Sequence, residues 1–240
     1  MLLKGKRVIV TGGTKGIGVA IARVLVQEGA AVIVAARTGA DVDRTAAELS
    51  PHAPSPVLGR ACDVGDPEQV KGLIDFCARN LGGLDILINN AGVGIFQTVA
   101  DLSIESWQQT VRTNLDGVFY CCHYALPLLK RANGGFIITI SSLAGRNAFP
   151  RGAAYNATKF GLTGFSEALM QEVRHDDIRV AYIMPGSVNT WFGGSPPEDE
   201  DSWKLSAQDV AQVVLETLCR PPRCLTSRIE MRPSRPPQKG

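Results

Sequence analysis

The chain of 240 residues is long enough to bury a substantial core, as one α/β domain or as two small ones. Hydrophobic residues make up 45% of it and charged residues 20%, proportions that are typical of folded globular proteins and exclude a disordered chain. The formal net charge of +2 lacks the strong basic excess of nucleic-acid-binding proteins, so we expect no nucleic-acid partner.

The six cysteines and three histidines form neither a CxxC pair nor the spacing of a zinc finger, so we expect no metal site. Unpaired thiols are typical of a reducing compartment. The apolar run at the N-terminus is too short for a signal peptide, and no stretch is long enough to span a membrane. These features predict a cytoplasmic protein without a membrane partner.

Short β-branched runs alternate along the chain with longer helical patterns. The runs are continuously apolar, which is typical of strands covered on both faces, as in a parallel sheet. The alternation predicts an α/β fold: a single-domain, doubly wound, mostly parallel sheet of seven strands, of the Rossmann type, with helices on both faces. The expected strands are 7–12, 30–36, 56–62, 84–90, 135–141, 178–185 and, at an edge, 226–232. The expected helices are 16–29, 40–50, 66–81, 104–131 (as one helix or two), 154–176 and 206–219.

The first expected strand ends in a glycine-rich turn, TGGTKGIG, which opens the first helix. Glycine lets the backbone turn tightly and approach a phosphate without a Cβ in between, and the helix N-terminus offers free amides to the anion. No Gly-Lys-Ser/Thr follows, which argues against a Walker-type loop. The turn predicts a dinucleotide site, and a purely structural turn is the alternative. The expected contacts are Gly12, Thr14, Lys15, Gly16, Ile17 and Gly18.

The end of the second expected strand discriminates between the two nicotinamide dinucleotides. An acidic residue there would accept hydrogen bonds from the ribose hydroxyls and repel the 2′-phosphate of NADP. The chain has Ala-Ala-Arg-Thr at 35–38, without a carboxylate. Arg37 is placed to bind a phosphate, and Lys15 adds a second cation. We therefore predict NADP(H) in preference to NAD(H), unless Arg37 is only a solvated residue at a strand end.

Six motifs together resemble the classical short-chain dehydrogenase/reductases, in that family's order and spacing. They are TGGTKGIG (11–18), NNAG (89–92), TNLDGVF (113–119), ISSLAG (140–145), YNATK (155–159) and PGSVNT (185–190). The likeness runs from about residue 5 to 190 and is nearest to proteins similar to β-ketoacyl-acyl-carrier-protein reductases. We expect one NADP-binding domain over 1–232, a flexible substrate lid over 191–204, including a mobile loop at 193–201, and a disordered tail over 233–240.

The resemblance implies four catalytic residues, Asn114, Ser142, Tyr155 and Lys159. Tyr155 would be the general acid toward a carbonyl and the base toward an alcohol, and Ser142 would polarise the same oxygen. Lys159 would bind the nicotinamide ribose and lower the pKa of Tyr155, and Asn114 would hold a water in a proton relay. Ser141 is a less suitable substitute for Ser142.

Tyr155 and Lys159 lie four residues apart, which places them on one face of a helix. Free tyrosine titrates near pH ~10, too high for a base at neutral pH. A cation about 5 Å away, at an effective dielectric constant of roughly 20, contributes about 3 kcal/mol, or some two pKa units. We therefore expect Lys159 to bring the pKa of the phenol most of the way to a useful range, whereas the alternative is an ordinary polar pair.

The same resemblance implies further cofactor contacts. The expected residues are Asp63, Val64, Asn89, Asn90, Ala91, Gly92, Pro185, Gly186, Val188 and Thr190. Asp63 and Val64 would flank the adenine, and the segment from Pro185 to Thr190 would meet the nicotinamide. Two alternatives stay open: NNAG also suits a structural role at the strand ends, and Asp63 also suits a cap for the helix that begins near residue 66.

Aromatic residues in the expected loops predict an apolar substrate pocket. Five aromatic residues and one leucine are expected at its rim: Phe96, Leu143, Phe149, Trp191, Phe192 and Trp203. The region after residue 190 is shorter than in many tetrameric relatives, which leaves a homo-oligomer expected but dimer or tetramer open. We predict an NADPH-dependent, reversible carbonyl reductase acting on a 3-oxoacyl compound or another apolar ketone or aldehyde. The alternatives are a catalytically silent NADP-sensing or scaffold protein and, less favoured, an epimerase or dehydratase.

Overall fold

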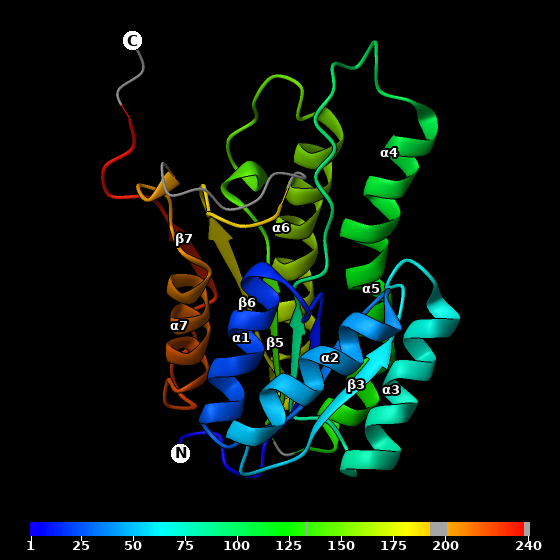
Figure 1. Ribbon diagram of the computed structural model, residues 1–240, viewed down its shortest axis with the longest axis vertical. Coiled ribbons are helices and arrows are strands. Elements are labelled where there is room, and N and C mark those ends of the chain that lie inside the picture. The colour runs from blue at the N-terminus through cyan, green and yellow to red at the C-terminus, as the bar shows by residue number, and fades with distance from the viewer. Residues whose placement is uncertain (133, 193–200, 238–240) are drawn as a thin grey trace.

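The sheet is the centre of the molecule. A computed structural model describes residues 1–132, 134–192 and 201–237, and within these ranges seven parallel strands follow the order β3-β2-β1-β4-β5-β6-β7 (Figure 1). The strands are β1 Arg7–Thr11, β2 Ala31–Ala36, β3 Val57–Ala61, β4 Ile86–Asn89, β5 Phe136–Ile140, β6 Arg179–Pro185 and β7 Arg228–Met231. All six neighbouring pairs are parallel, so the predicted doubly wound sheet and its seventh edge strand are confirmed.

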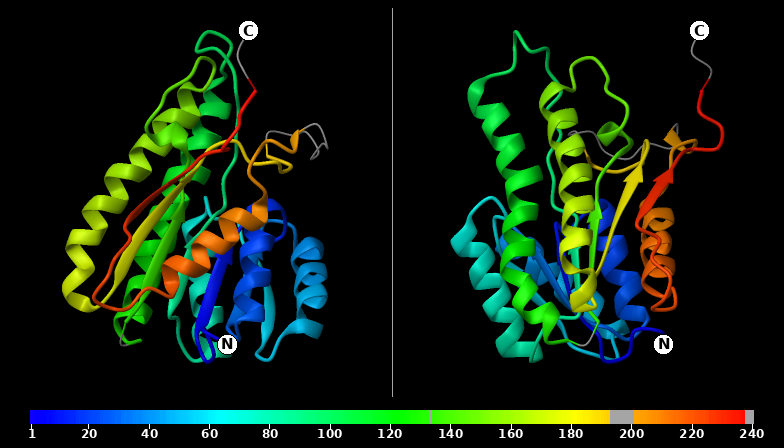
Figure 2. Two further views of the ribbon diagram at one scale, coloured as in Figure 1. Left: turned by 90° about the vertical axis from the view of Figure 1, so that its left-hand side faces the viewer. Right: turned by 180° about the vertical axis from the view of Figure 1, so that it is seen from behind.

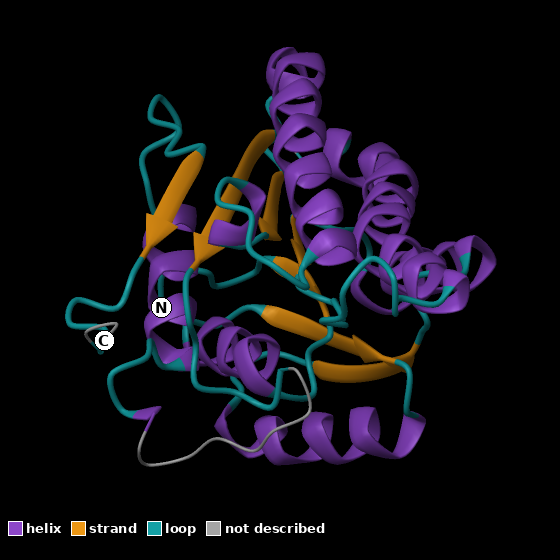
Figure 3. Ribbon diagram, turned by 90° about the horizontal axis from the view of Figure 1, so that it is seen from above, coloured by secondary structure: helices purple, strands orange, loops and turns teal. Residues whose placement is uncertain are grey.

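Helices cover both faces of the sheet (Figure 3). They are α1 Gly16–Gln27, α2 Gly39–Leu49, α3 Pro67–Leu81, α4 Ile104–Val111, α5 Gly117–Lys130, α6 Ala153–Val173 and α7 Ala207–Leu218. The first core lies beneath α1, α2 and α7, and the second lies beneath α3, α5 and α6. Figure 2 shows α1 and α7 side by side on the first face. Burial on both faces explains why the central strands are apolar throughout rather than alternating.

The expected helix 104–131 forms with an irregularity in its middle. A π-helical turn, Arg112–Asp116, separates α4 from α5, and the three segments run on as one long helix beside α6 (Figure 2). A π turn takes in an extra residue and is frequent at functional sites. Asn114, one of the predicted catalytic residues, lies inside this turn.

Several expectations concern the loops and the chain ends. Residues 193–200 of the expected lid, and 238–240 of the expected tail, lie outside the described residues. Within the described ranges, no helix is long and apolar enough to cross a membrane. All six cysteines are free thiols, and four of them are buried.

Candidate active site

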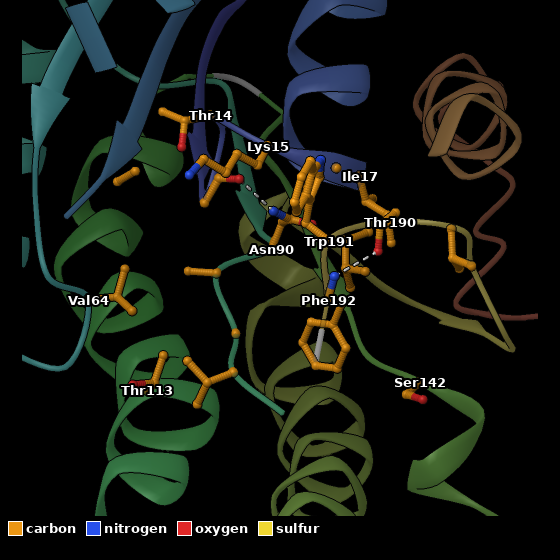
Figure 4. Close-up of a pocket in the computed structure, with 18 of the residues that line it drawn as sticks. Thr14, Lys15, Ile17, Val64, Asn90, Thr113, Ser142, Thr190, Trp191 and Phe192 are labelled. Carbon is orange, nitrogen blue, oxygen red and sulfur yellow. Dashed lines mark hydrogen bonds between the residues drawn. The ribbon is translucent and has the colours of Figure 1, made fainter. Parts of the chain in front are cut away.

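A cavity of about 450 Å³ opens where the parallel strands end. The strand order turns back between β1 and β4, and ligands of open α/β sheets bind in the crevice at that point. The predicted residues that line the cavity are Gly12, Thr14, Lys15, Gly16, Ile17, Arg37, Asp63, Val64, Asn90, Ala91, Gly92, Ser142, Tyr155, Lys159, Pro185, Gly186, Val188 and Thr190. Figure 4 shows Thr14 and Lys15 at one end of the cavity and Ser142 and Phe192 at the other.

Six other residues line the cavity. Five of them were not predicted as site residues from the sequence, and the sixth, Ser141, was given only as a substitute for Ser142. The six are Ala36, Cys62, Val93, Thr113, Ile140 and Ser141. Each lies at a strand end or directly beside a recognised motif. Such positions follow from the sheet topology, and that is the signal by which they could have been found.

The glycine turn is built by close approach of two backbone segments. Gly12 has a φ of +63°, and a Cβ there would lie 2.9 Å from the Cα of Ala91. A Cβ on Gly18 would overlap the carbonyl oxygen of Gly12 and lie 2.5 Å from Nδ2 of Asn90. Gly18 therefore lets α1 pack against the turn and, unlike the other predicted glycines, is not among the residues that line the cavity.

Asn90 stabilises this turn through hydrogen bonds. Its Nδ2 donates to the carbonyl oxygens of Thr11 at 3.0 Å and of Gly12 at 3.1 Å, and its backbone amide donates to the Thr11 hydroxyl. Asn90 thus has the structural role that NNAG suggested and also lines the cavity. Asn89, expected in the cleft, is instead buried beneath it and donates to the sulfur of Cys122 at 3.4 Å.

The end of the cavity near α1 and α2 carries positive groups, namely the amides of a helix start and the side chains of Arg37 and Lys15. The N-terminus of α1 has no side-chain cap, so its amides are free to meet an anion. Arg37 is exposed and makes no hydrogen bond or ion pair with any described residue. Lys15 lies 3.6 Å from Asp41, a carboxylate that sequence reasoning missed. Arg44 and Lys15 hold the pKa of Asp41 below its usual range, so Asp41 stays ionised and offsets part of the charge of Lys15, whereas Arg37 has no described partner.

Asp63 lines the cavity and is held by its neighbours. Its carboxylate accepts from Arg112 at 2.9 Å and from the backbone amide of Gly65 at 3.0 Å. The cap of α3 is Asp66, which accepts from two backbone amides of the first turn. The alternative that Asp63 caps this helix is therefore wrong.

Asn114 is buried and does not line the cavity. Its Oδ1 accepts from the amide of Val93 at 2.8 Å, and its Nδ2 donates to the Val93 carbonyl at 2.9 Å and to Thr158 at 3.3 Å. Thr158 in turn donates to the carbonyl oxygen of Tyr155 at 2.8 Å. Both amide protons are used, so this side chain joins the Val93 segment to the helix that carries Tyr155 and has no proton left to donate to a relay water.

Tyr155 lies at the opposite end of the cavity from the glycine turn. Burial raises the pKa of its phenol to about 12, and a hydrogen bond from Ser142 acts in the opposite direction. The Ser142 oxygen also accepts from the amide of Ala144 at 3.1 Å, which fixes its orientation. Ser141 lines the cavity too, but its buried hydroxyl has no partner in the described structure, so Ser142 is the serine that meets Tyr155.

Lys159 is buried one turn after Tyr155, as the spacing predicted. Its Nζ lies 5.5 Å from the centre of the Tyr155 ring and donates to the Ile140 carbonyl at 3.1 Å. Burial lowers the pKa of Lys159 to about 8. In the protein alone, the net shift of the phenol pKa is therefore upward, opposite to the expected direction, because burial raises the pKa of Tyr155 by more than Ser142 lowers it.

Asn156 is a site residue that sequence reasoning missed. Its buried Nδ2 donates to the carbonyls of Ala144 at 2.7 Å and Asn147 at 3.3 Å, and its Oδ1 accepts from the Phe149 amide at 3.4 Å. These bonds tie the segment after Ser142 to α6 beside Tyr155. The motif YNATK contains four polar residues that are all buried in the structure, and this run of polar residues was the only signal for Asn156 in the sequence.

Two phenylalanine rings contact the phenol directly. Phe96 lies 5.5 Å from Tyr155 between ring centres, and Phe192 lies 5.6 Å from it. Phe149 packs on Phe96 at 5.8 Å. Three residues of the expected rim thus gather at the end of the cavity that holds the phenol.

The other expected rim residues do not all lie at the cavity. Trp191 lines the cavity, and Leu143 packs over Gly186 beside it. Trp203 instead lies beneath the ammonium group of Lys204, 5.7 Å away. The cavity therefore joins an end that suits an anion to an end that combines a proton donor with apolar rings.

The sequence profile of the short chain dehydrogenase family matches residues 6–201. An uncharacterized oxidoreductase of Staphylococcus aureus (strain USA300) is 32% identical over 97% of this chain and 99% of its own length. A 3alpha-hydroxysteroid dehydrogenase of Mediterraneibacter gnavus is 34% identical over 82% of this chain and 80% of its own length. The chain therefore belongs to the short chain dehydrogenase family of oxidoreductases.

Solved structures agree in fold over nearly the whole chain. An alcohol dehydrogenase from the archaeon Thermococcus sibiricus, complexed with 5-hydroxy-NADP, superimposes with a TM-score of 0.91 at 28% identity, over 98% of this chain and 99% of that one. A metagenomic short-chain oxidoreductase in complex with NADP gives a TM-score of 0.86 at 30% identity, over 98% and 100%.

Proposed function

We propose that the protein is an NADPH-dependent carbonyl reductase that also runs in reverse as an alcohol dehydrogenase. One observation carries the proposal: Tyr155, hydrogen-bonded to Ser142 and one turn from Lys159, lies in the same cavity as the glycine turn. A proton donor and a dinucleotide cradle in one cavity are what carbonyl reduction requires. All four predicted residues are part of this proposal: Ser142, Tyr155 and Lys159 act in the cavity, and Asn114 positions the helix that carries Tyr155.

The residues present fit a nicotinamide dinucleotide. The close approach at Gly12 leaves backbone exposed to a pyrophosphate, the uncapped α1 offers amides to it, and Ser141 presents an unpartnered buried hydroxyl to the cavity. Lys15 and Arg37 support a preference for NADP(H), since their positive charges suit a 2′-phosphate. Two structural relatives were solved with NADP or 5-hydroxy-NADP, which supports the same choice.

When bound, the nicotinamide supplies the hydride that carbonyl reduction needs. Tyr155 supplies the proton: with a pKa of about 12 it is protonated at neutral pH, as a general acid must be. Ser142 donates a hydrogen bond to the same oxygen and so stabilises the charge that develops there. Lys159, anchored on the Ile140 carbonyl, holds its side chain beside the phenol and toward the cavity.

The test is loss of NADPH absorbance with a panel of ketones, aldehydes and 3-oxoacyl thioesters. Tyr155→Phe removes the proton donor, so we expect kcat to fall about 10²- to 10⁴-fold while NADPH still binds. Tyr124→Phe, on α5 and in contact with His123, is the matched control and keeps its activity. Tight NADPH binding without turnover of any compound would favour the silent NADP-sensing alternative instead.

We also propose that residues 1–232 act as one domain in a homo-oligomer within the cytoplasm. Phe119 on α5 and Phe160 on α6 are 48% and 47% exposed, which suits burial against a second copy along the long helix and α6. The free thiols suit a reducing compartment. Light scattering of the purified protein distinguishes a monomer from a dimer or tetramer.

A further inference from the structure

Three phenylalanine rings, each from a different loop, gather beside Tyr155: two contact its ring, and the third packs on one of those two. Phe96 follows β4, Phe149 follows β5 and Phe192 follows β6. Phe96 contacts Tyr155 edge-on, with an angle of 72° between the rings, and also lies 6.4 Å from Phe192. The phenol therefore lies in an aromatic cluster that the chain assembles from distant segments.

Phe192 fills the space in front of the phenol. A Cβ on Gly94 would lie 2.6 Å from Phe192 and 2.9 Å from Phe96, so these two rings are packed against the Gly94 backbone. Figure 4 shows the Phe192 ring pointing into the cavity, and its amide donates to Thr190 at 3.3 Å. The ring is still 46% exposed, so it is held on one side only. Because Tyr155 and Phe192 line the same cavity, a substrate that reaches the phenol lies against this ring.

Among the described residues, the charged groups nearest to the three rings are Lys159 and Arg151, and both are bound to carbonyl oxygens. Lys15, Arg37 and Asp63 lie at the end near the glycine turn, and Lys159 is bound to a carbonyl. Arg151 is at the rim, where it donates to the carbonyl of Phe96 at 3.4 Å. A charged substituent held between the rings would lose its water, and neither cation is free to replace that water fully.

We propose that the substrate is an uncharged aryl ketone or aldehyde whose ring packs against Phe96 and Phe192. The proposal rests on the proposed carbonyl reduction and names its substrate class. An aryl ring makes edge-to-face contacts of the kind that these rings already make with one another, whereas an alkyl group gives only apolar area. Phe96 and Phe192 are thus the specificity-determining residues of the site.

The first experiment compares acetophenone with cyclohexyl methyl ketone, two ketones of nearly equal size of which only the first has an aromatic ring. The measured quantity is the ratio of their kcat/KM values, in the wild type, Phe96→Leu and Phe192→Leu. We expect each variant to lower the ratio about fivefold, because the aromatic contacts are lost and apolar volume is kept. Comparing ratios cancels the intrinsic difference in reactivity between the two ketones.

Phe76→Leu on α3 is the matched control, because Phe76 is in contact with Arg60 and is remote from the cavity. It should leave the ratio unchanged. A ratio that stays the same in Phe96→Leu and Phe192→Leu overturns the proposal. The second comparison uses 4-acetylbenzoate, which adds a carboxylate to acetophenone; we expect kcat/KM at least about tenfold lower. An equal or higher value also overturns the proposal.

A binding measurement separates this inference from the proposed function. Protein loaded with NADP⁺ has no hydride to give, so calorimetry reports binding of acetophenone without turnover. We expect binding that weakens in Phe192→Leu. If no carbonyl is reduced with NADPH but this binding pattern holds, carbonyl reduction fails and aryl recognition stands. If cyclohexyl methyl ketone is reduced and acetophenone neither binds nor reacts, the inference fails and the proposed function stands.

Discussion

The two ends of the cavity are built in different ways. The end near α1 is made mainly of backbone: a short turn, its two positive-φ glycines and the amides of a helix start, all within residues 12–18. The end near Tyr155 is made of side chains from β4–α4, β5–α6 and β6–α7 connections that meet only in the fold. A site built from one short segment can be recognised from a sequence motif, whereas a site whose side chains come from distant segments can be recognised only in the structure.

The largest effect is expected from the buried lysine at the Tyr155 end. Burial lowers the pKa of Lys159 to about 8, so between there and its ordinary value near 10.5 the unfolded chain holds a proton that the folded one has lost. Stability should therefore rise with pH across this interval, by about 3 kcal/mol from this group alone. Denaturant unfolding at several pH values, compared with Lys159→Met, isolates the contribution. Parallel pH profiles of the two proteins would contradict the assigned pKa.

The next effect concerns the backbone-built end. In Gly18→Ala the new methyl group has no room between the Gly12 carbonyl and Asn90, so the free energy of unfolding should fall by about 2 kcal/mol, and NADPH should bind more weakly. Gly164→Ala is the control, because a Cβ there meets nothing within 4 Å and the site is an ordinary helix interior. That variant should be neutral or more stable. Equal losses in both variants would refute the close-packing role of Gly18.

A third variant tests whether the Tyr155 end can be damaged separately. Asn156→Ala leaves the buried carbonyl of Ala144 without its donor, which costs about 1–3 kcal/mol of stability and loosens the Ser142 segment. We expect kcat to fall about tenfold through misplacement of Ser142, with the Kd for NADPH unchanged. Asn147→Ala is the control, since only the backbone of Asn147 takes part. A loss of NADPH affinity equal to the loss of kcat would indicate general destabilisation rather than positioning.

The smallest effect is expected from the phosphate subsite. Arg37→Ala removes an exposed cation with no described partner, so stability should be unchanged and the preference for NADPH over NADH should fall about tenfold. The ratio of kcat/KM values for the two cofactors is the measurement. Arg79→Ala on α3 is the control. A preference for NADH in the wild type would refute the assignment of Arg37 to a 2′-phosphate.

Sequence alone predicted the fold because each strand is a short, continuously apolar run between helical patterns. The boundaries were less exact: the expected strand 84–90 is β4 Ile86–Asn89, since Asp85 binds Arg7 through its side chain. The expected helix 154–176 begins one residue earlier and ends at Val173, where a tight turn leads to Asp177 at a φ of +56°. Such ends depend on local hydrogen bonds that periodicity does not register.

The chemistry of the site was less predictable than its residues. Spacing predicted that Lys159 lies beside Tyr155, but the direction of the pKa shift depends on burial, which one helix does not reveal. Asn156 was missed because a polar residue near a helix start is usually solvated, and only the packing of the Phe149 segment buries it.

The π turn at Arg112–Asp116 constrains the number of residues in the chain as well as their identity. Each residue of a regular helix advances the side chains about 100° around the axis and about 1.5 Å along it. Because the turn takes in an extra residue, removing one residue other than Asn114 would restore a regular helix with α4 and α5 in nearly the same orientation, but the side chains that remain in the turn would point in new directions. Asn114 would then lose the hydrogen bonds by which it joins the Val93 segment to α6. A deletion here would therefore damage the site as severely as a change of side chain, although every predicted catalytic residue would still be present.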